Sequence, residues 1–387
     1  MLEQARALHS QLIEWRRDFH MHPELGFAET QTASRAAETL EKLGFRVRRR
    51  VGRTGVVAEL GSGSPTIAIR ADMDALPLQE ANAAPYASQN PGVMHACGHD
   101  AHVAMALGAA TLLARTPFRG TVRLLLQPSE EAGDAEGLSG APRMVEDGAM
   151  KDVDWVLALH VDPSTPVGQI RVSAGPSSGG VDSFFGSVIG KGGHGARPQD
   201  GIDPFYLTAH VILALNAVVS RHIAPFDAAV VSLGTVNGGH TQNVIPDRVE
   251  LSGTLRFTEA RVQAQIHAEI RRAFEVARAL GGDYELRFEI GSLPMVNHPR
   301  AVDVIQAVAG AMLGADNVLP IEKDLGAEDF GSFLALAPGA MFMLGARREG
   351  DVRFAHNPTF DIDEAALPLG SAILAQAALH LADHSGN

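Results

Sequence analysis

Apolar and polar residues along this 387-residue chain form two recurring patterns. Stretches with apolar residues three or four positions apart predict helices, and short, nearly continuous apolar runs predict strands. In the first part of the chain, the predicted helices are Leu2–Phe19, Thr32–Leu43 and Val103–Leu113. The predicted strands are Val56–Leu60, Thr66–Arg70, Thr121–Leu126 and Trp155–Leu159, with Arg46–Arg53 as an edge strand. Helices placed between apolar strands indicate an α/β domain.

Polar residues follow three of these strands. They are, in chain order, Asp72 and Asp74, Glu130 and Glu131, and His160. In open α/β sheets, ligands bind at the carboxyl ends of parallel strands, so we expect these polar side chains to converge.

The segment Met94–His102 holds the only cysteine, three histidines and an aspartate within nine residues. Cys97 and His99 offer a thiolate and an imidazole, the groups that hold divalent metals such as zinc, and Gly98 lets both aim at one point. A Cys-x-His motif alone is more often a buried cysteine beside surface histidines. A metal site is favoured here because further ligand types follow at Glu131, His160 and His356.

The pattern changes near Val181, where strands of alternating polarity begin. The predicted elements are, in order, strand Ser183–Gly190, a helix with Leu207–Val218, strands Ala229–Val236 and Arg248–Phe257, a helix with Val262–Phe274, and strand Tyr284–Ile290. This βαββαβ order is typical of a small two-layer α+β domain. We expect it to be an insertion at residues 181–291, because the first pattern resumes with Val302–Leu313, Ala340–Leu344 and Ala365–Ala382. The first domain would then comprise residues 1–180 and 292–387.

Composition narrows the class of protein. Hydrophobic residues make up 45% of the chain and charged residues 20%, as in ordinary globular proteins. The formal charge of -13 argues against nucleic-acid and anionic-membrane partners. One cysteine excludes an internal disulfide and favours a reducing compartment. Neither a signal peptide nor a membrane span is predicted, so we expect a soluble cytoplasmic protein.

The five candidate ligands are Cys97, His99, Glu131, His160 and His356. One tetrahedral site needs only four ligands, so five indicate two divalent ions (manganese, zinc, cobalt or nickel) bridged by the thiolate. Two metals about 3.5–4 Å apart lower the pKa of a bridging water and polarise a carbonyl oxygen. Glu130 would remain free as the general base. The alternative for an acidic pair taken alone is a solvated loop.

Two further features have competing interpretations. Asp72 and Asp74 fit carboxylates that orient ligand imidazoles through the second ring nitrogen, and they fit a chain-reversing turn equally well. His160, taken alone, also fits a satisfied core histidine.

The predicted insertion carries candidates for substrate contact. His194 lies in a glycine-rich loop that lacks the ending of a phosphate-binding loop and suits a donor to a developing oxyanion. Asn243 and Arg256 are candidates for gripping a substrate carboxylate, although each alone would more often be a surface residue.

Nearly end to end, the chain resembles the metal-dependent amidohydrolases that include hippurate hydrolase, N-acyl-L-amino-acid amidohydrolases and plant indoleacetyl-amino acid hydrolases, within the clan of two-domain carboxypeptidases and aminoacylases. The segments that carry the resemblance are Arg70–Pro77, Cys97–His102, Gln127–Glu131, Leu159–His160, Gly192–Pro198, Asn243–Pro246, Glu328–Phe330 and His356–Asp361.

The resemblance implies a three-layer α/β/α catalytic domain with a mixed sheet, and a smaller lid that forms a homodimer or higher homo-oligomer. It implies the same five ligands and Glu130 as general base, with Asp74 in the catalytic set. His194 would reach an active site, that of a partner subunit included, and Asn243 and Arg256 would bind the amino acid carboxylate. The chain departs from the family at Asp162, where an aromatic is usual, at the insert Gly133–Pro142, and at Gly331–Phe333. These departures leave the acyl group and amino acid open.

The predicted activity is hydrolysis of the amide in an N-acyl-amino acid. Dipeptide or carboxypeptidase-type hydrolysis on the same two-metal site is the alternative within enzymes. A metal-binding protein without catalysis is the alternative from another class, and the presence of Glu130 argues against it. A zinc nucleobase deaminase is disfavoured because it needs a Pro-Cys-x-x-Cys segment, and the chain has only one cysteine. A nicotinamide dehydrogenase is disfavoured because no glycine fingerprint follows a strand.

Overall fold

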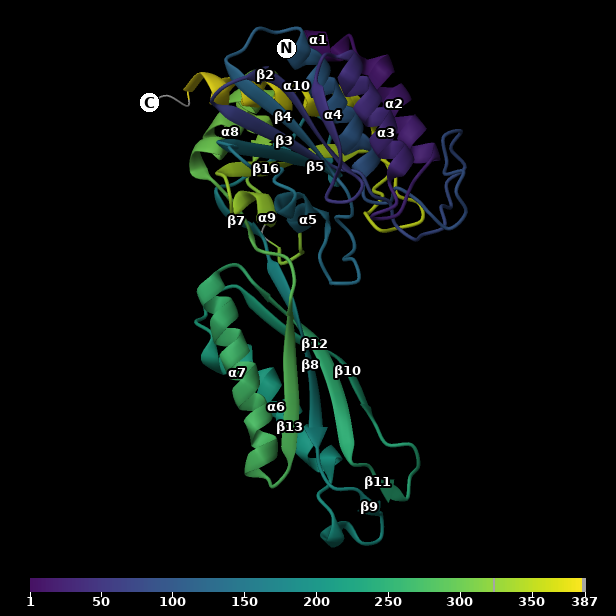
Figure 1. Ribbon diagram of the computed structural model, residues 1–387, viewed down its shortest axis with the longest axis vertical. Helices are drawn as coiled ribbons and strands as arrows, with labels where there is room; N and C mark the ends of the chain where they lie inside the picture. Colours follow the sequence, from purple (N-terminus) through teal and green to yellow (C-terminus); the bar gives the residue numbers. More distant parts are fainter. Residues whose placement is uncertain (323, 385–387) are drawn as a thin grey trace. The chain divides into compact units, whose positions relative to one another are not determined.

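The computed structural model describes residues 1–322 and 324–384, and it divides into two compact units (Figure 1). The first contains Met1–Ser177, Val296–Glu322 and the chain from Asp329 onward. The second contains Ser178–Met295 and the short segment that ends at Glu328. The predicted insertion, residues 181–291, lies inside the second unit.

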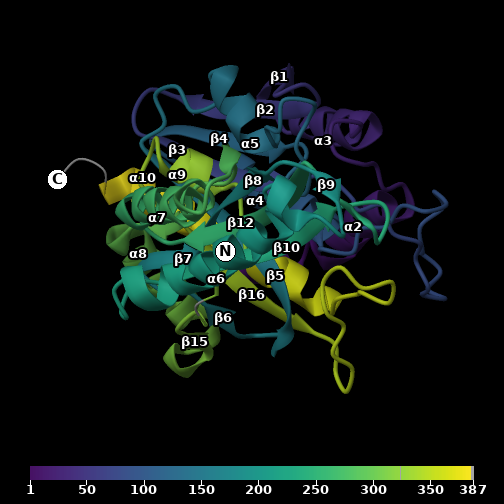
Figure 2. The ribbon, with the colours of Figure 1, turned by 90° about the horizontal axis from the view of Figure 1, so that it is seen from below.

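An eight-stranded mixed sheet forms the centre of the first unit, in the order β1-β2-β4-β3-β5-β16-β6-β15 (Figure 2). β3 is parallel to β4 and β5, and β16 is parallel to β5, whereas β1 and β2 are antiparallel to their neighbours. The bounds are β1 Arg46–Val51, β2 Gly55–Ser62, β3 Thr66–Asp72, β4 Gly120–Gln127, β5 Trp155–Pro166, β6 Ile170–Arg171, β15 Val318–Leu319 and β16 Gly339–Arg347. The predicted mixed α/β class is confirmed, and Arg46–Val51 is an edge strand as expected.

Helices of the first unit supply the rest of its core. They are α1 Leu2–Arg6, α2 His9–Met21, α3 Thr30–Lys42, α4 His99–Ala114, α5 Gly140–Glu146, α8 Pro299–Leu313, α9 Gly331–Leu334 and α10 Leu367–His384, with single 3-10 turns at Ala315–Asn317 and Glu364–Ala366. All residues of α4 except the last are buried, as its uniformly apolar sequence predicts, and α4 packs against α2 and α10. A Cβ on Gly108 would lie 2.3 Å from Ser371 Oγ, so glycine permits the close approach of α4 and α10.

Several predicted boundaries in this unit differ from the structure. The helix expected from Val103 begins at His99, so two histidines of the metal-binding motif lie on its first turn. The helix expected at Leu2–Phe19 is two helices separated by a turn at Ala7–Leu8, which apolar spacing does not reveal. The strand expected to end at Leu159 continues through His160 to Pro166, because β16 extends its pairing with β5 that far.

The C-terminal segment Glu364–His384 is the one stretch within the described residues that is long and apolar enough to cross a membrane. Its most apolar window is 78% buried inside the structure. Burial in the core of the first unit therefore accounts for its composition.

The second unit is a four-stranded antiparallel sheet in the order β10-β12-β8-β13, covered on one face by α6 and α7. The bounds are β8 Gly180–Ile189, α6 Pro204–His222, β10 Ala229–Gly238, β12 Arg248–Phe257, α7 Ala260–Ala279 and β13 Asp283–Ile290. Buried and half-buried residues alternate strictly along β8, so Phe184 and Val188 face the helices. The second unit also holds the short pairing of β9 Gly193–His194 with β11 Val244–Ile245 and a 3-10 turn at Pro198–Asp200. The pairing of β7 Gly175–Ser178 with β14 Met295–Asn297 falls where the chain passes between the two units, and most of its residues belong to the first.

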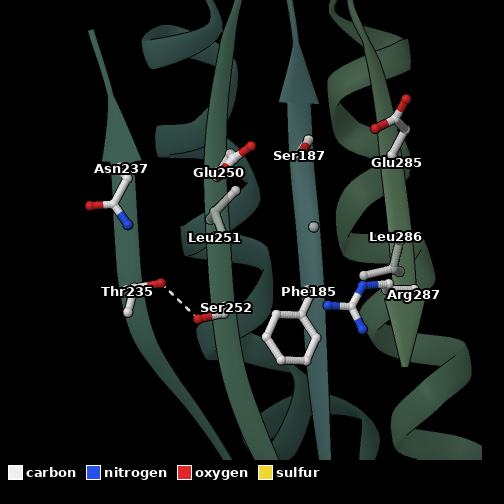
Figure 3. A pocket seen from close by; sticks show the side chains of 11 residues that line it. Phe185, Ser187, Thr235, Asn237, Glu250, Leu251, Ser252, Glu285, Leu286 and Arg287 are labelled. Carbon is white, nitrogen blue, oxygen red and sulfur yellow. Dashed lines mark hydrogen bonds between the residues drawn. The ribbon is translucent and has the colours of Figure 1, made fainter. Parts of the chain in front are cut away.

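The other face of this sheet is polar and open to solvent. A hollow of about 410 Å³ lies on this face. Among the residues that line it are Thr235 and Ser252, which share a hydrogen bond of 2.7 Å, and Arg287 beside Phe185 (Figure 3). The Arg287 guanidinium lies 4.0 Å from the centre of the Phe185 ring. Helices on one face and polar side chains on the other make the unit two-layered, whereas its roles as lid and dimerisation domain stay predictions.

Candidate two-metal active site

The turn before α4 brings a thiol and an imidazole next to β5, an interior strand of the sheet. Gly98 has a φ of +96°, in the left-handed region, and a Cβ there would lie 2.3 Å from Val161 Cγ2 on β5. Only glycine fits both the conformation and the space. The turn therefore places Cys97 and His99 against the strand that carries His160, with Cys97 Sγ 3.4 Å from His160 Nε2.

All five predicted ligands come together in the first unit. Potential ligand atoms lie within 4.8 Å of one another in each of three overlapping groups: Cys97 with His99 and His160, Cys97 with Glu131 and His356, and His99 with Glu130 and Glu131. Because Cys97, His99 and Glu131 each occur in two groups, the three groups form one cluster. His356 Nε2 lies 2.9 Å from Glu131 Oε1, and its backbone N–H donates to Ala96 O at 2.7 Å.

Hydrogen bonds fix the direction of the His99 ring. Its Nδ1 donates to the backbone oxygen of Asp74 at 2.9 Å and lies 3.2 Å from Asp74 Oδ1. Nε2 is buried, has no hydrogen-bond partner among the described residues and lies 3.6 Å from Asp72 Oδ2. Because Nδ1 is engaged, Nε2 is the ring nitrogen that would bind a metal. Asp74 also accepts the N–H of Glu131 at 3.0 Å, so one carboxylate orients two candidate ligands.

Asp72 has a different set of partners. His102 Nδ1 donates to Asp72 Oδ1 at 2.6 Å, and His102 Nε2 accepts the Val161 N–H at 3.0 Å, so both nitrogens of this ring are engaged. The second Asp72 oxygen accepts a hydrogen bond from Arg70 at 2.6 Å. Asp72 thus links the buried Arg70 to His102 below the cluster of candidate ligands. Both aspartates therefore orient other side chains and are not simple turn residues.

Electrostatics in the cluster favours a bound cation. Burial raises the pKa of the Cys97 thiol, so the thiolate needs nearby positive charge to form. Burial alone would lower the pKa of His99, but Asp72 and Cys97 outweigh it and raise that pKa. Burial raises the pKa of Glu131, but the hydrogen bond from His356 lowers it, and the net change is a decrease. In turn, Glu131 raises the pKa of His356.

The donor set fits two divalent ions. It offers one sulfur, three imidazoles and a carboxylate, and it contains a buried imidazole nitrogen, His99 Nε2, that makes no hydrogen bond to any described residue. A pair of cations would stabilise the Cys97 thiolate, accept the lone pair of His99 Nε2 and reduce the repulsion between the carboxylates of Glu130 and Glu131.

The three remaining predicted site residues lie in the second unit, at two different places. His194 and Asn243 are brought together, because His194 pairs with Val244 and the Gly195 N–H donates to Asn243 O at 2.8 Å. Arg256 lies at the other end of β12, where it pairs with Val181 and donates to Leu325 O at 2.9 Å. The eight residue steps from Arg248 to Arg256 span about 26 Å of strand. Within one chain, Arg256 therefore does not join the other two.

Sequence reasoning assigned no role to a buried polar network beneath the site. The fully buried Arg70 donates from Nε to Gln127 Oε1 at 2.7 Å and from its terminal nitrogens to Asp72 and Asp329, at 2.6 and 3.1 Å. Gln127 Nε2 also donates to Asp329 at 2.8 Å. An arginine inside an otherwise apolar strand was the available signal.

A family comparison decides the class of protein. The family model described as Peptidase family M20/M25/M40 matches residues 68–380. The chain belongs to this family. The resemblance noted from the motifs is thereby confirmed.

Individual relatives match almost the whole chain. Thermostable carboxypeptidase 2 of Saccharolobus solfataricus is 39% identical over 93% of this chain and 92% of its own length. N-acetyl-L-cysteine deacetylase of Bacillus subtilis is 37% identical over 97% of this chain and 89% of its own length. The crystal structure of a dinuclear metal-binding M20 peptidase from Bacillus subtilis has a TM-score of 0.85 and 33% identity, and the match covers 98% of this chain and 99% of that one.

Family and geometry together make this M20 protein a metal-dependent amidohydrolase. A cluster of five potential metal ligands beside a second carboxylate is the arrangement that metal-assisted hydrolysis requires.

Proposed function

We propose that this enzyme hydrolyses the amide bond of N-acyl-L-amino acids, such as N-acetyl-amino acids or hippurate, to a carboxylic acid and a free amino acid. The observation that carries the proposal is the Glu130–Glu131 pair beside His99, in which one carboxylate suits the metal and the other suits a base. The N-acetyl-L-cysteine deacetylase relative supports this substrate class.

Cys97, His99, Glu131, His160 and His356 would hold two divalent ions (manganese, zinc, cobalt or nickel). When bound, such ions lower the pKa of a water and polarise the amide oxygen. Glu130 takes a proton from the water as its oxygen bonds to the amide carbon. The C–N bond then breaks, and Glu130 returns the proton to the leaving nitrogen. Asp74 keeps His99 and the acidic loop in place through the hydrogen bonds described above.

Substrate contacts would come from the second unit, with His194 as oxyanion donor and Asn243 and Arg256 as carboxylate ligands. Arg256 lies about 26 Å along β12 from Arg248, the end of the strand that follows the β9–β11 pairing of His194, so one small substrate is not expected to touch both residues in one chain. We therefore propose a homodimer or higher homo-oligomer in which His194 serves the partner's active site. The exposed edge strand β10, with Val230 and Val236 on it, supports self-association.

Hydrolysis of dipeptides, or carboxypeptidase action on the same site, is the second candidate, and the thermostable carboxypeptidase relative favours it. The two activities differ in whether the pocket must accept a free ammonium group.

The proposed location is the cytoplasm, where the Cys97 thiol stays reduced.

The test is amide hydrolysis by metal-stripped protein resupplied with manganese, zinc or cobalt. The substrates are N-acetyl-amino acids, hippurate and unblocked dipeptides, and Glu130→Gln is measured beside the wild type. We expect metal-dependent release of amino acid from the acylated substrates, lost in Glu130→Gln with metal content unchanged. Turnover of dipeptides alone would replace the proposal with dipeptidase activity. No turnover of any substrate with two metals bound would refute it.

A further inference from the structure

The residue before the proposed general base has an unusual backbone conformation. Ser129 has a φ of +43°, in the left-handed region that side-chain-bearing residues seldom adopt, and it is fully buried. Glu130 follows directly, so the φ of Ser129 sets the direction in which the Glu130 side chain leaves the loop. Such a conformation persists only when the surrounding contacts hold it.

A fully buried carboxylate one hundred residues away makes that contact. Glu29 Oε1 accepts the backbone N–H of Ser129 at 2.7 Å, and Glu29 Oε2 accepts the Thr54 hydroxyl. Glu29 occupies the position that precedes α3, yet its side chain does not cap this helix. Glu24 does so instead, by accepting the N–H groups of Gln31 and Thr32 at 3.0 and 2.9 Å. Glu29 is therefore available to the acidic loop.

The loop is held on the far side of Glu130 as well. Asp74 Oδ2 accepts the N–H of Glu131 at 3.0 Å, so carboxylates bind backbone N–H groups on both sides of the base. Packing leaves little room for a different path, because a Cβ on Gly26 would lie 2.2 Å from Ser129 Oγ. Ser129 Oγ donates to Ala132 O at 2.8 Å, which closes the turn.

We propose that Glu29 is a positioning residue for amide hydrolysis, which holds Ser129 in its left-handed conformation and thereby aims the Glu130 carboxylate. This inference rests on the proposed function. The hydrogen-bond acceptor is the required feature, and the charge is not. Burial raises the pKa of Glu29 to about 7, with Asp74 as the charged neighbour that adds to the increase, so the group is partly neutral near physiological pH. Glutamine, which keeps the acceptor and the length, should therefore replace it.

The test compares Glu29→Ala, Glu29→Gln and the control Glu24→Ala, which removes a neighbouring carboxylate that does not contact Ser129. We expect Glu29→Ala to lower kcat by about 10- to 100-fold with little change in KM, because a small misplacement of a reacting group costs that much. Glu29→Gln should stay within about threefold of the wild type, and Glu24→Ala should destabilise the protein without this loss of kcat. Metal content should be the same in all four proteins.

Hydrogen exchange at the Ser129 amide gives a readout independent of activity. We expect exchange at least about tenfold faster in Glu29→Ala and near wild-type rates in Glu29→Gln and Glu24→Ala. Unchanged kcat or unchanged Ser129 exchange in Glu29→Ala would overturn the inference, and so would an equal loss of kcat in Glu24→Ala. If Glu29→Ala does not fold, Glu29→Asp, one methylene shorter, takes its place with the same criteria. If the wild type hydrolyses no amide, the proposed function fails, and amide exchange alone decides whether Glu29 holds the loop.

Discussion

Replacing Gly98 with alanine tests how tightly the metal-binding turn is packed against β5. Two costs add at this position. A left-handed φ of +96° costs about 1–2 kcal/mol for a residue with a Cβ. The new methyl group, 2.3 Å from Val161 Cγ2, adds about 1–3 kcal/mol for displacing a buried neighbour. We therefore expect Gly98→Ala to lower the free energy of unfolding by about 2–5 kcal/mol and to weaken metal binding, because Cys97 and His99 flank the substituted residue.

The assay is urea unfolding of metal-free protein, with Gly44→Ala as the matched control. Gly44 follows the end of α3 with a φ of +87°, and no atom outside its chain neighbours lies within 4 Å of an added Cβ. Gly44→Ala should therefore show only the conformational cost of about 1–2 kcal/mol. The double variant Gly98→Ala/Val161→Ala should lose less than the sum of its single variants, because the second substitution creates the missing space. Equal losses in Gly98→Ala and Gly44→Ala would refute the packing argument.

Three further predictions concern charge and metal. Because the pKa of Glu29 is raised from 4.5 to about 7, its contribution to stability is complete below pH 4.5 and is lost as the pH rises through about 7. Across that interval the wild type should lose about 3 kcal/mol relative to Glu29→Gln in urea titrations, and parallel curves would contradict the shift. Arg70→Met should destabilise the protein by about 3–5 kcal/mol, because Asp72 and Asp329 would remain buried without their cation; less than about 1 kcal/mol would show that the network is dispensable. Chelation should lower the Tm, and cobalt should restore it with a thiolate-to-metal absorption band that Cys97→Ser lacks; a band retained in Cys97→Ser would remove the thiol from the ligand set.

The elements of this protein were largely predictable from local patterns. Uniformly apolar segments became the buried α4 and the central strands, and alternating segments became the half-buried strands β8 and β12. The candidate ligands were predictable because Cys97 and His99 share a Cys-x-His motif and because Glu131 and His160 follow apolar runs near the carboxyl ends of parallel strands. Periodicity and side-chain chemistry are properties of short segments, so a single sequence displays them directly.

Pairings between distant residues were decided only by the tertiary structure. The sequence placed Asp72 and Asp74 in equivalent roles, but the structure pairs them differently. Asp74 accepts a hydrogen bond from His99, whereas Asp72 accepts hydrogen bonds from Arg70 and His102. The structure joins Glu29 to Ser129 across one hundred residues. It places Arg256 in the four-stranded sheet and His194 in the separate β9–β11 pairing, which precedes the opposite end of β12. Strand register and the close approach at Gly98 determine these contacts. Both depend on how whole elements pack, and no local pattern records which buried donor will face which acceptor.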